Sequence, residues 1–286
     1  MSKILEALQL DQIEEDTFEG RSRDIGTPQV YGGQVLGQAL EAARRTVEDR
    51  EVHSVHAYFL RRGDFDIPIV YQVDRNRDGG SFTARRVVAS QHGKPIFTLS
   101  ASFQKQETGL DHYESITMPA TPDQLTEMGL LTPDSGRHAI SLLASDFDAY
   151  RVEPDPENKT TSLRWWVKTH DSLPNEQSAH NTILAYISDF GLLMAAVTPH
   201  APSAATPHAP SIEERRALWS KMLFASIDHA IWFHRPFRAD EWLLYDCNPV
   251  STSNSRGCAR GSFYDTRGVL VATTFQEGLT RLKKTS

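Results

Sequence analysis

The feature that most constrains this chain of 286 residues is an internal repeat. Phe59 opens the tripeptide Phe-Leu-Arg and precedes Tyr71 by twelve positions, and Phe233 opens Phe-His-Arg and precedes Tyr245 at the same spacing. A later pair, Ser-Ala-Ser-Phe-Gln and Ala-Thr-Thr-Phe-Gln, occupies residues 100–104 and 272–276. The offset is 174 residues at the first pair and 172 at the second. Similarity at a nearly constant offset predicts two copies of one structural unit.

Each copy is expected to begin with a helix and continue with strands, an order that argues against chance likeness between two β-rich segments. The helical segments are residues 34–45 and 183–197. Turn residues such as those at 78–80 separate the strands that follow. The predicted strands are 70–75, 82–90 and 95–104 in the first copy, and 163–168, 241–247, 257–264 and 269–276 in the second.

The last strand of each copy alternates between apolar and polar residues. The alternate positions are Phe97, Leu99, Ala101 and Phe103 in the first copy, and Val269, Val271, Thr273 and Phe275 in the second. Successive side chains of a strand point to opposite faces of the sheet. We therefore expect these residues to form the buried face of each sheet, packed against the helix.

The order of elements favours an α+β fold in two domains. We expect an N-terminal domain at 1–106, a connecting segment with up to two short helices at 107–160, and a C-terminal domain at 161–286 that carries the catalytic residues. A Pro/Ala-rich tandem repeat at 198–211 lacks core residues and is expected to be a surface loop. Its histidines have no Cys, Asp or Glu at ligand spacing beside them, so no metal site is predicted.

Composition excludes several classes of protein. A net charge of -7 does not suit a general nucleic-acid binder. The two cysteines, Cys247 and Cys258, indicate no disulfide framework. The longest apolar stretch, 183–197, is too short to span a membrane. The first residues lack the apolar core of a signal peptide and the last are not Ser-Lys-Leu, so a cytoplasmic protein is expected.

Asp189 is the first candidate for chemistry, because it interrupts the apolar segment 183–197. A helix that is apolar all round is buried, and an unpaired buried carboxylate is costly. Burial would also raise the pKa of the Asp189 carboxyl toward the range of a general base. The alternative is a structural aspartate that bonds nearby backbone. No carboxylate occupies the middle of residues 34–43, so the second copy is expected to carry the chemistry.

Two further regions offer polar groups. Gln276 is expected to end the last strand, opposite Phe275, where its amide could hold a water or an oxyanion. The segment 226–229 reads Ser-Ile-Asp-His and suggests a serine triad, but no nucleophile elbow is present. We expect His229 to bond backbone or to shape a pocket. The glycines at 32–37 form no phosphate-binding loop and are expected to let a helix approach the sheet.

The chain resembles type II acyl-CoA thioesterases, the double-hotdog family, in stretches that span nearly its whole length. These stretches are residues 31–39, 53–61, 78–86, 186–189, 227–229, 232–237 and 276–278. The resemblance implies two tandem hotdog domains, each a long central helix wrapped by an antiparallel sheet. It implies hydrolysis of acyl-CoA to fatty acid and CoA, without a metal or cofactor. It also implies assembly into a homodimer or homotetramer.

In that family an aspartate, a threonine or serine and a glutamine hold the attacking water, and by position these are Asp189, Ser226 and Gln276. Ser226 stands where relatives commonly have threonine, and only a methyl group is lost. Backbone N–H groups near Gly191 are expected to stabilise the oxyanion. CoA phosphates are expected to meet surface arginines, with His229 as a further substrate contact. The candidate arginines are Arg61, Arg62, Arg85, Arg86, Arg256 and Arg260.

Two rival functions share this fold. A hotdog enoyl-CoA hydratase usually pairs aspartate with histidine on one short segment, and no histidine lies within five residues after Asp189. A non-catalytic acyl-CoA sensor would not need a buried carboxylate. The preferred acyl-chain length and the choice between CoA and acyl-carrier-protein substrates stay open at this stage.

Overall fold

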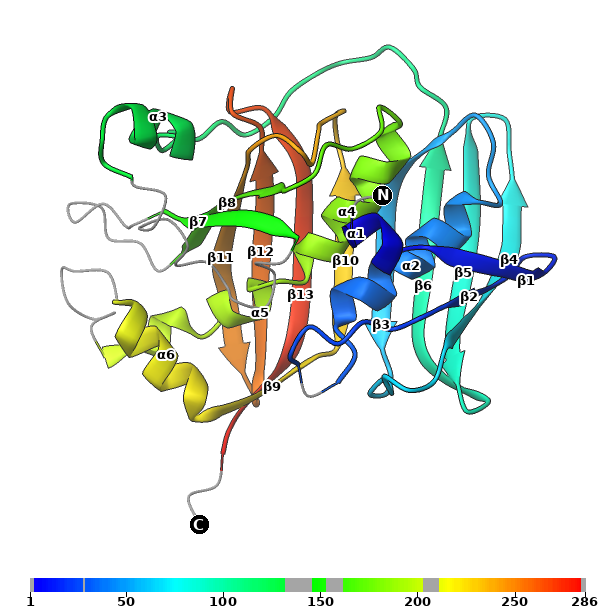
Figure 1. The fold of residues 1–286 in the computed structure, drawn as a ribbon, viewed down its shortest axis with the longest axis horizontal. Coiled ribbons are helices and arrows are strands. Elements are labelled where there is room, and N and C mark those ends of the chain that lie inside the picture. The colour runs from blue at the N-terminus through cyan, green and yellow to red at the C-terminus, as the bar shows by residue number, and fades with distance from the viewer. Residues whose placement is uncertain (1–2, 28, 132–145, 153–161, 203–210, 284–286) are drawn as a thin grey trace.

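The computed structural model describes residues 3–27, 29–131, 146–152, 162–202 and 211–283, whose strands form one antiparallel sheet (Figure 1). The first half contains α1 (Lys3–Ala7), β1 (Leu10–Glu14), β2 (Thr17–Gly20), α2 (Gly32–Arg44), β3 (Glu51–Phe59), β4 (Ile69–Asp78), β5 (Phe82–Gln91) and β6 (Lys94–Gln104). The second contains β7 (Phe147–Arg151), β8 (Leu163–Thr169), α4 (Gln177–Ser188), α5 (Leu192–Ala195), the 3-10 turn η1 (Thr198–His200), α6 (Ile212–Ser220), β9 (Met222–Ser226), β10 (Asp228–Phe233), β11 (Leu243–Ser253), β12 (Arg256–Tyr264) and β13 (Leu270–Leu282). Between the halves lies α3 (Pro122–Glu127).

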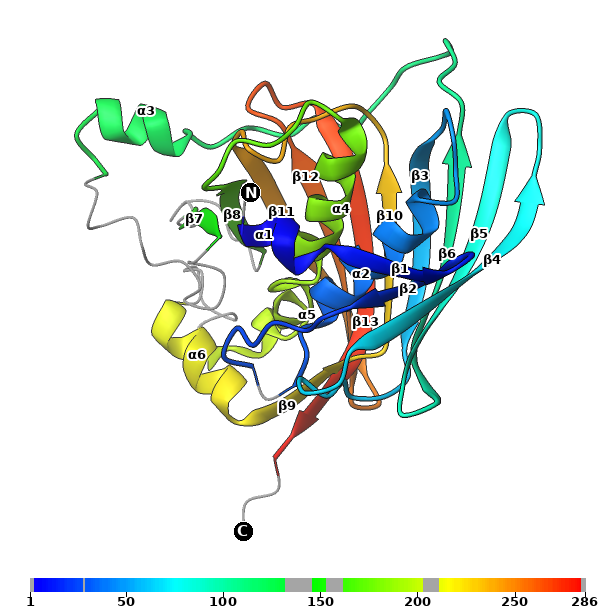
Figure 2. The same ribbon diagram turned by 45° about the vertical axis from the view of Figure 1, so that its right-hand side comes forward.

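The order of the strands shows the duplication. Neighbours run β1-β2-β4-β5-β6-β3-β10-β13-β12-β11-β8-β7, with β9 paired to β13 off this path. The second six strands repeat the first six in reverse, and the halves join where β3 pairs with β10. Each half-sheet wraps one long helix, α2 or α4, as Figure 2 shows from a second angle. The predicted α+β double hotdog is therefore confirmed.

The two long helices pack directly on each other in the centre of the molecule. A Cβ added to Gly33 of α2 would lie 2.2 Å from the carbonyl oxygen of Tyr186 in α4, so only glycine permits this approach. One turn later, a Cβ added to Gly37 would lie 3.4 Å from the carbonyl oxygen of Thr182 in α4. The expectation that these glycines serve helix–sheet contact is thus corrected for Gly33, whose close neighbour is the other helix, whereas Gly32 does lie against the Phe59 ring of β3.

The apolar segment 183–197 does not form one helix. α4 ends at Ser188, and α5 begins only at Leu192. Gly191 between them has a φ of 71°, in the left-handed region where glycine carries no steric penalty. The sequence suggested that Asp189 lies in the middle of a helix. In the structure it is instead the C-cap of α4.

The predicted face of the last strand is confirmed in the first half and wrong in the second. In β6, alternate residues from Phe97 to Phe103 are at most 3 % exposed. In β13, Phe275 is 36 % exposed, whereas Gln276 is fully buried and the strand continues to Leu282. Within the sheet, Ala272 pairs with Phe233 as Phe97 pairs with Phe59. Relative to these pairs, the Phe-Gln sequences at 103–104 and 275–276 are offset by an odd number of residues. The second phenylalanine therefore points to the opposite face of the sheet from the first.

Two predictions for the connecting region also change. β7 lies within 107–160 and pairs with β8, so the second half-sheet begins before residue 161 and 163–168 is not its opening strand.

Residues 203–210 of the Pro/Ala-rich segment lie outside the described residues. In the ranges that the structure describes, no single helix is long and apolar enough to cross a membrane, although α4 and Leu192–His200 pass that test together as a bent pair.

Candidate active site

The end of α4 directs Asp189 toward the first half of the molecule. Phe190 donates its backbone N–H to the Ile187 carbonyl at 2.8 Å, and the left-handed Gly191 then turns the chain away. A left-handed glycine just beyond a helix end is a common stop signal. As a result the carboxylate projects from the last turn of α4 toward the N-terminus of α2.

Three side chains that are far apart in sequence meet at this carboxylate. Ser226, at the end of β9, donates its hydroxyl to Oδ1 of Asp189 at 3.3 Å. Gln276, on the buried face of β13, donates through Nε2 both to Oδ1 of Asp189 and to the Ser226 oxygen, the latter at 2.9 Å. β9 and β13 are paired, which fixes Ser226 beside Gln276. The structure thus brings together the three residues that the sequence singled out.

The first half completes the surroundings of Asp189. The backbone N–H of Gly33 is hydrogen-bonded to its carboxylate. A Cβ added to Gly32 would lie 2.7 Å from Oδ2 of Asp189. Tyr31, the N-cap of α2, provides no side-chain cap, so Asp189 satisfies an N–H at a helix end that favours negative charge. Sequence reasoning missed Gly32 and Gly33, because it assigned the site to the second copy alone.

Burial is the main influence on the charge of Asp189. Desolvation raises the pKa of its carboxyl above the usual value, and hydrogen bonds from Gln276, Ser226 and the Gly33 backbone oppose that rise. A carboxylate with a raised pKa and several donors around it suits a general base. Among the described residues, the Gln276 Oε1 atom is buried without a hydrogen-bond partner. Such an orphaned acceptor is free to receive a hydrogen from a bound molecule.

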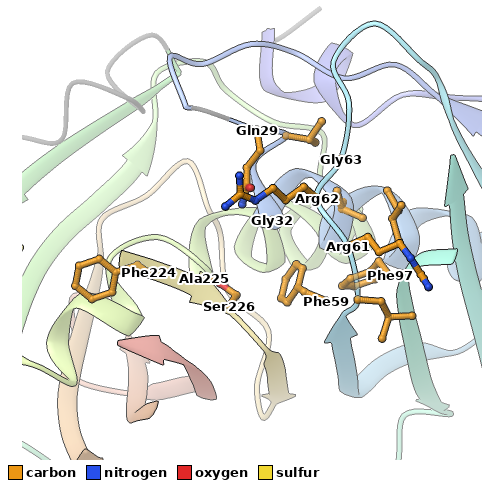
Figure 3. Close-up of a pocket in the computed structure, with 14 residues that line it drawn as sticks. Gln29, Gly32, Phe59, Arg61, Arg62, Gly63, Phe97, Phe224, Ala225 and Ser226 are labelled. Carbon is orange, nitrogen blue, oxygen red and sulfur yellow. The ribbon is translucent and has the colours of Figure 1, made fainter. Parts of the chain in front are cut away.

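A cavity of about 230 Å³ opens beside this cluster (Figure 3). Both halves of the molecule line it, with Ser226 from β9 on one side and Gly32 from α2 on another. Its walls are largely apolar, and two arginines with Gln29 add polar groups. The apolar lining consists of Val30, Val35, Phe59, Leu60, Ile96, Phe97, Phe224 and Ala225. An apolar cavity with a few convergent polar groups is typical of a ligand site.

The candidate arginines fall into two groups. Arg61 and Arg62 line the cavity. Arg85 does not lie at the surface as expected: its side chain is 2 % exposed and bonds Thr46 and Asp78. The other three, which are Arg86, Arg256 and Arg260, lie near Asp74, Glu277 and Glu114 respectively, and none lines the cavity.

His229 is not part of a serine triad. Its Nε2 lies 2.9 Å from the Ser188 hydroxyl, which is a side chain and not the backbone partner expected. Burial lowers the pKa of His229 to about 3, so the ring is neutral. The hydroxyl of Ser226 turns to Asp189, and Asp228 accepts the backbone N–H of Glu277 at 2.8 Å. His229 and Gly191 are not among the residues that line the cavity, and neither are Asp189 and Gln276, whose cluster meets the cavity through Ser226 and beside Gly32.

No group of three or more His, Cys, Asp or Glu side chains in the described ranges could hold a metal ion. The polar groups gathered here are one carboxylate, one hydroxyl, one amide and the N-terminus of α2. Together they can bind a water, remove its proton and stabilise negative charge that develops nearby.

Comparisons with known proteins cover nearly the whole chain. Residues 145–279 match the family model described as acyl-CoA thioesterase, and residues 19–104 match that described as acyl-CoA thioesterase N-terminal domain. Human acyl-coenzyme A thioesterase 8 is 35 % identical over 98 % of this chain and 89 % of its own length. Acyl-CoA thioesterase 2 of Haemophilus influenzae is 35 % identical over 99 % of both chains. The crystal structure of acyl-CoA thioesterase II TesB2 from Mycobacterium marinum, 37 % identical, superposes with a TM-score of 0.80 over 98 % of this chain and 99 % of its own.

Proposed function

Because the chain belongs to the acyl-CoA thioesterase family, we propose that it hydrolyses acyl-CoA thioesters with a water held by Asp189, Ser226 and Gln276. The observation that carries this proposal is the hydrogen-bonded cluster of these three residues beside a cavity lined by both halves. The assignment of roles rests on the geometry around the carboxylate.

The two carboxylate oxygens of Asp189 have different surroundings. Oδ1 receives the hydrogen bonds of Ser226 and Gln276, whereas Oδ2 lies against Gly32, which lines the cavity. Oδ2 is therefore the oxygen placed to accept a proton from a water in the cavity. The unpartnered Oε1 of Gln276 accepts the second hydrogen of that water and orients its lone pair.

The reaction then follows from proton and electron balance. Water transfers one proton to Asp189 while its oxygen bonds to the thioester carbonyl carbon. The carbonyl oxygen becomes an oxyanion, and we assign its stabilisation to the positive N-terminus of α2, where Gly32 lines the cavity. The oxyanion collapses, the C–S bond breaks, and the leaving thiolate takes the proton from Asp189. The products are a carboxylic acid and a thiol.

The cavity suggests how the substrate is held. Its apolar walls suit the thioester and the alkyl groups beside it, and Arg62 is exposed at the cavity with its guanidinium near Gln29 (Figure 3). The Arg61 guanidinium points the other way and bonds the Pro95 carbonyl. We therefore assign contact with the CoA phosphates to Arg62 first. The hydratase alternative is disfavoured, because the side chains bonded to Asp189 are those of Ser226 and Gln276, and no histidine in the described ranges is bonded to it.

The first test is free-thiol release from acyl-CoAs of C4 to C18 by the wild type and by Asp189→Asn. Loss of a general base costs on the order of 10²–10⁴-fold, so the variant should lose at least about 10²-fold. Asp228→Asn is the matched control, since that carboxylate bonds the Glu277 N–H and should be dispensable. Hydrolysis that survives Asp189→Asn would move the base elsewhere. Wild-type protein that is folded and releases no thiol would overturn the function.

We also propose that the chain assembles as a homodimer or homotetramer, as its resemblance to double-hotdog thioesterases implies. Light scattering coupled to gel filtration measures the mass directly. A species at the 32.1 kDa of one chain across the accessible concentrations would reject this assembly.

A further inference from the structure

Two tyrosine hydroxyls hold the end of α4 from which Asp189 projects. Tyr245, on β11, donates its hydroxyl to the Ser188 carbonyl oxygen at 2.6 Å. Tyr31, at the N-cap of α2, donates to the Tyr186 carbonyl oxygen at 2.9 Å. The last four carbonyls of a helix have no partner within the helix, and these two are satisfied by phenols from opposite halves of the molecule.

Tyr245 is held in place from several directions. Its ring stacks on Phe263 with centroids 3.9 Å apart and an angle of 8°. A Cβ added to Gly261 would lie 2.4 Å from the Tyr245 ring, so a side chain there would displace it. The hydroxyl also lies 3.3 Å from Oγ1 of Thr274 on β13. Tyr245 is 2 % exposed, and burial raises the pKa of its phenol well above the usual value, which keeps the hydroxyl a donor.

We propose that Tyr245 is a positioning residue for the hydrolysis: its hydroxyl fixes the Ser188 carbonyl and so sets the place and charge of the adjacent Asp189 carboxylate. This inference rests on the proposed function, in which Asp189 removes the proton from water. The position matters because a misplacement of about 1 Å in a catalytic group can cost about 10²-fold in rate.

The charge matters as well. Carbonyls at a helix C-terminus carry partial negative charge, which opposes an ionised carboxylate at the same end. A hydrogen bond from Tyr245 offsets that charge at the carbonyl directly before Asp189. Among the residues that the structure describes, the titratable side chains around the carboxylate are Tyr31 and Tyr245, together with His229 through Ser188. Burial holds all three neutral near pH 7, by raising the pKa of both phenols and lowering that of His229 to about 3.

The duplication supplies a matched control. Tyr71 occupies the position on β4 that Tyr245 occupies on β11, and it is also fully buried. Its hydroxyl donates at 2.6 Å to Oε1 of Gln38, a side chain of α2, and not to a helix end beside a carboxylate. Removing the Tyr71 hydroxyl deletes its hydrogen bond to Gln38, and removing the Tyr245 hydroxyl deletes its bonds to the Ser188 carbonyl and to Thr274. Only the Tyr245 hydroxyl lies next to the reacting groups.

The experiment compares Tyr245→Phe with Tyr71→Phe and Asp189→Asn. We measure kcat and KM for one acyl-CoA across pH, and thermal unfolding for each protein. Tyr245→Phe should lower kcat by about tenfold or more, change KM little and move the acid limb of the pH profile to higher pH. Tyr71→Phe should lower the unfolding temperature by a similar amount and leave kcat and the pH profile unchanged.

A Tyr245→Phe enzyme with wild-type kcat and pH profile would overturn the inference, as would equal losses of kcat in both tyrosine variants. Asp189→Asn separates the two proposals: if it retains activity, the assignment of Asp189 as the general base fails, whereas if it is inactive and Tyr245→Phe is normal, only the positioning role fails. Should Tyr245→Phe not fold, Tyr31→Phe tests the same device at the Tyr186 carbonyl. A lower kcat with a shifted acid limb is again expected, and an unchanged profile would reject the inference.

Discussion

Oδ2 of Asp189 lies against the backbone of Gly32, so closely that a Cβ added to Gly32 would meet that oxygen at 2.7 Å. The two residues belong to different halves of the chain, and Gly32 begins the helix whose Gly33 N–H bonds the same carboxylate. The same added Cβ would lie 2.8 Å from the Phe59 ring, which also lines the cavity. The absence of a side chain at residue 32 therefore keeps the space in which the water is proposed to lie.

Gly32→Ala should reduce hydrolysis while the protein stays folded. The methyl group must displace either the carboxylate or the Phe59 ring, and a shift of this size should cost on the order of tenfold to 10²-fold in kcat/KM. Gly80→Ala is the control, because a Cβ there meets nothing within 4 Å. Steady-state kinetics with circular dichroism decide the matter. Wild-type kinetics in Gly32→Ala would show that the space beside Oδ2 is not used.

The raised pKa of Asp189 should couple stability to pH in a defined direction. Between the unfolded and folded pKa values, the folded protein keeps a proton that the unfolded chain has released. This contribution is therefore present at low pH and is lost as pH rises through the folded pKa. Urea unfolding of wild type and Asp189→Asn at a series of pH values measures it. The wild type should gain stability relative to the variant as pH falls, and parallel curves would contradict the burial argument.

Some of this site could be predicted from sequence, for physical reasons. Asp189 stands out because a carboxylate within an apolar segment is expected to be buried; in the structure it is partly buried, and desolvation raises the pKa of its carboxyl. The meeting of Asp189 with Ser226 and Gln276 came from the family resemblance, because no local rule brings together residues on α4, β9 and β13. The duplication was visible because Phe59 and Phe233 lie at equivalent places in paired strands.

The remaining features depend on contacts between the copies. Gly32 and Gly33 belong to the first half, whereas the sequence pointed to a site in the second half alone. Two glycines at the start of a helix do indicate that another part of the chain approaches the backbone closely there. The break after Ser188 was hidden because apolar residues continue beyond it, and Gly191 was its one local signal. The face of β13 was misassigned because the repeated Phe-Gln sequence matches in letters and not in register.

Ser226 is expected to act through its hydroxyl alone. Ser226→Ala removes the donor to Oδ1 of Asp189 and the acceptor for Gln276, leaving that amide with one partner fewer. A buried polar group that loses its partner costs about 1–3 kcal/mol, so kcat should fall by about tenfold or more. Ser226→Thr keeps the hydroxyl and should retain most activity. If both variants lose activity alike, it is the size of the side chain at residue 226, and not its hydroxyl, that matters.

Arg62 should contribute to binding of the nucleotide end of the substrate and not to the chemical step. It is exposed at the cavity, and the charge of its guanidinium suits CoA phosphates. An exposed ion pair contributes about 0.2–1 kcal/mol, so Arg62→Ala should raise KM for acyl-CoA by about two- to fivefold at low salt and leave kcat unchanged. Added salt should shrink the difference, because screening weakens exposed pairs.

Acyl thioesters of N-acetylcysteamine test this assignment sharply, since they carry the reacting group without phosphates. Arg62→Ala should hydrolyse them as the wild type does. Arg86→Ala is the matched control, because Arg86 is an exposed arginine outside the cavity, 4.0 Å from Asp74, and its loss should leave KM for acyl-CoA unchanged. If Arg62→Ala weakens both substrate types equally, the residue shapes the cavity instead, and the phosphate contact must be sought at another basic residue near its mouth.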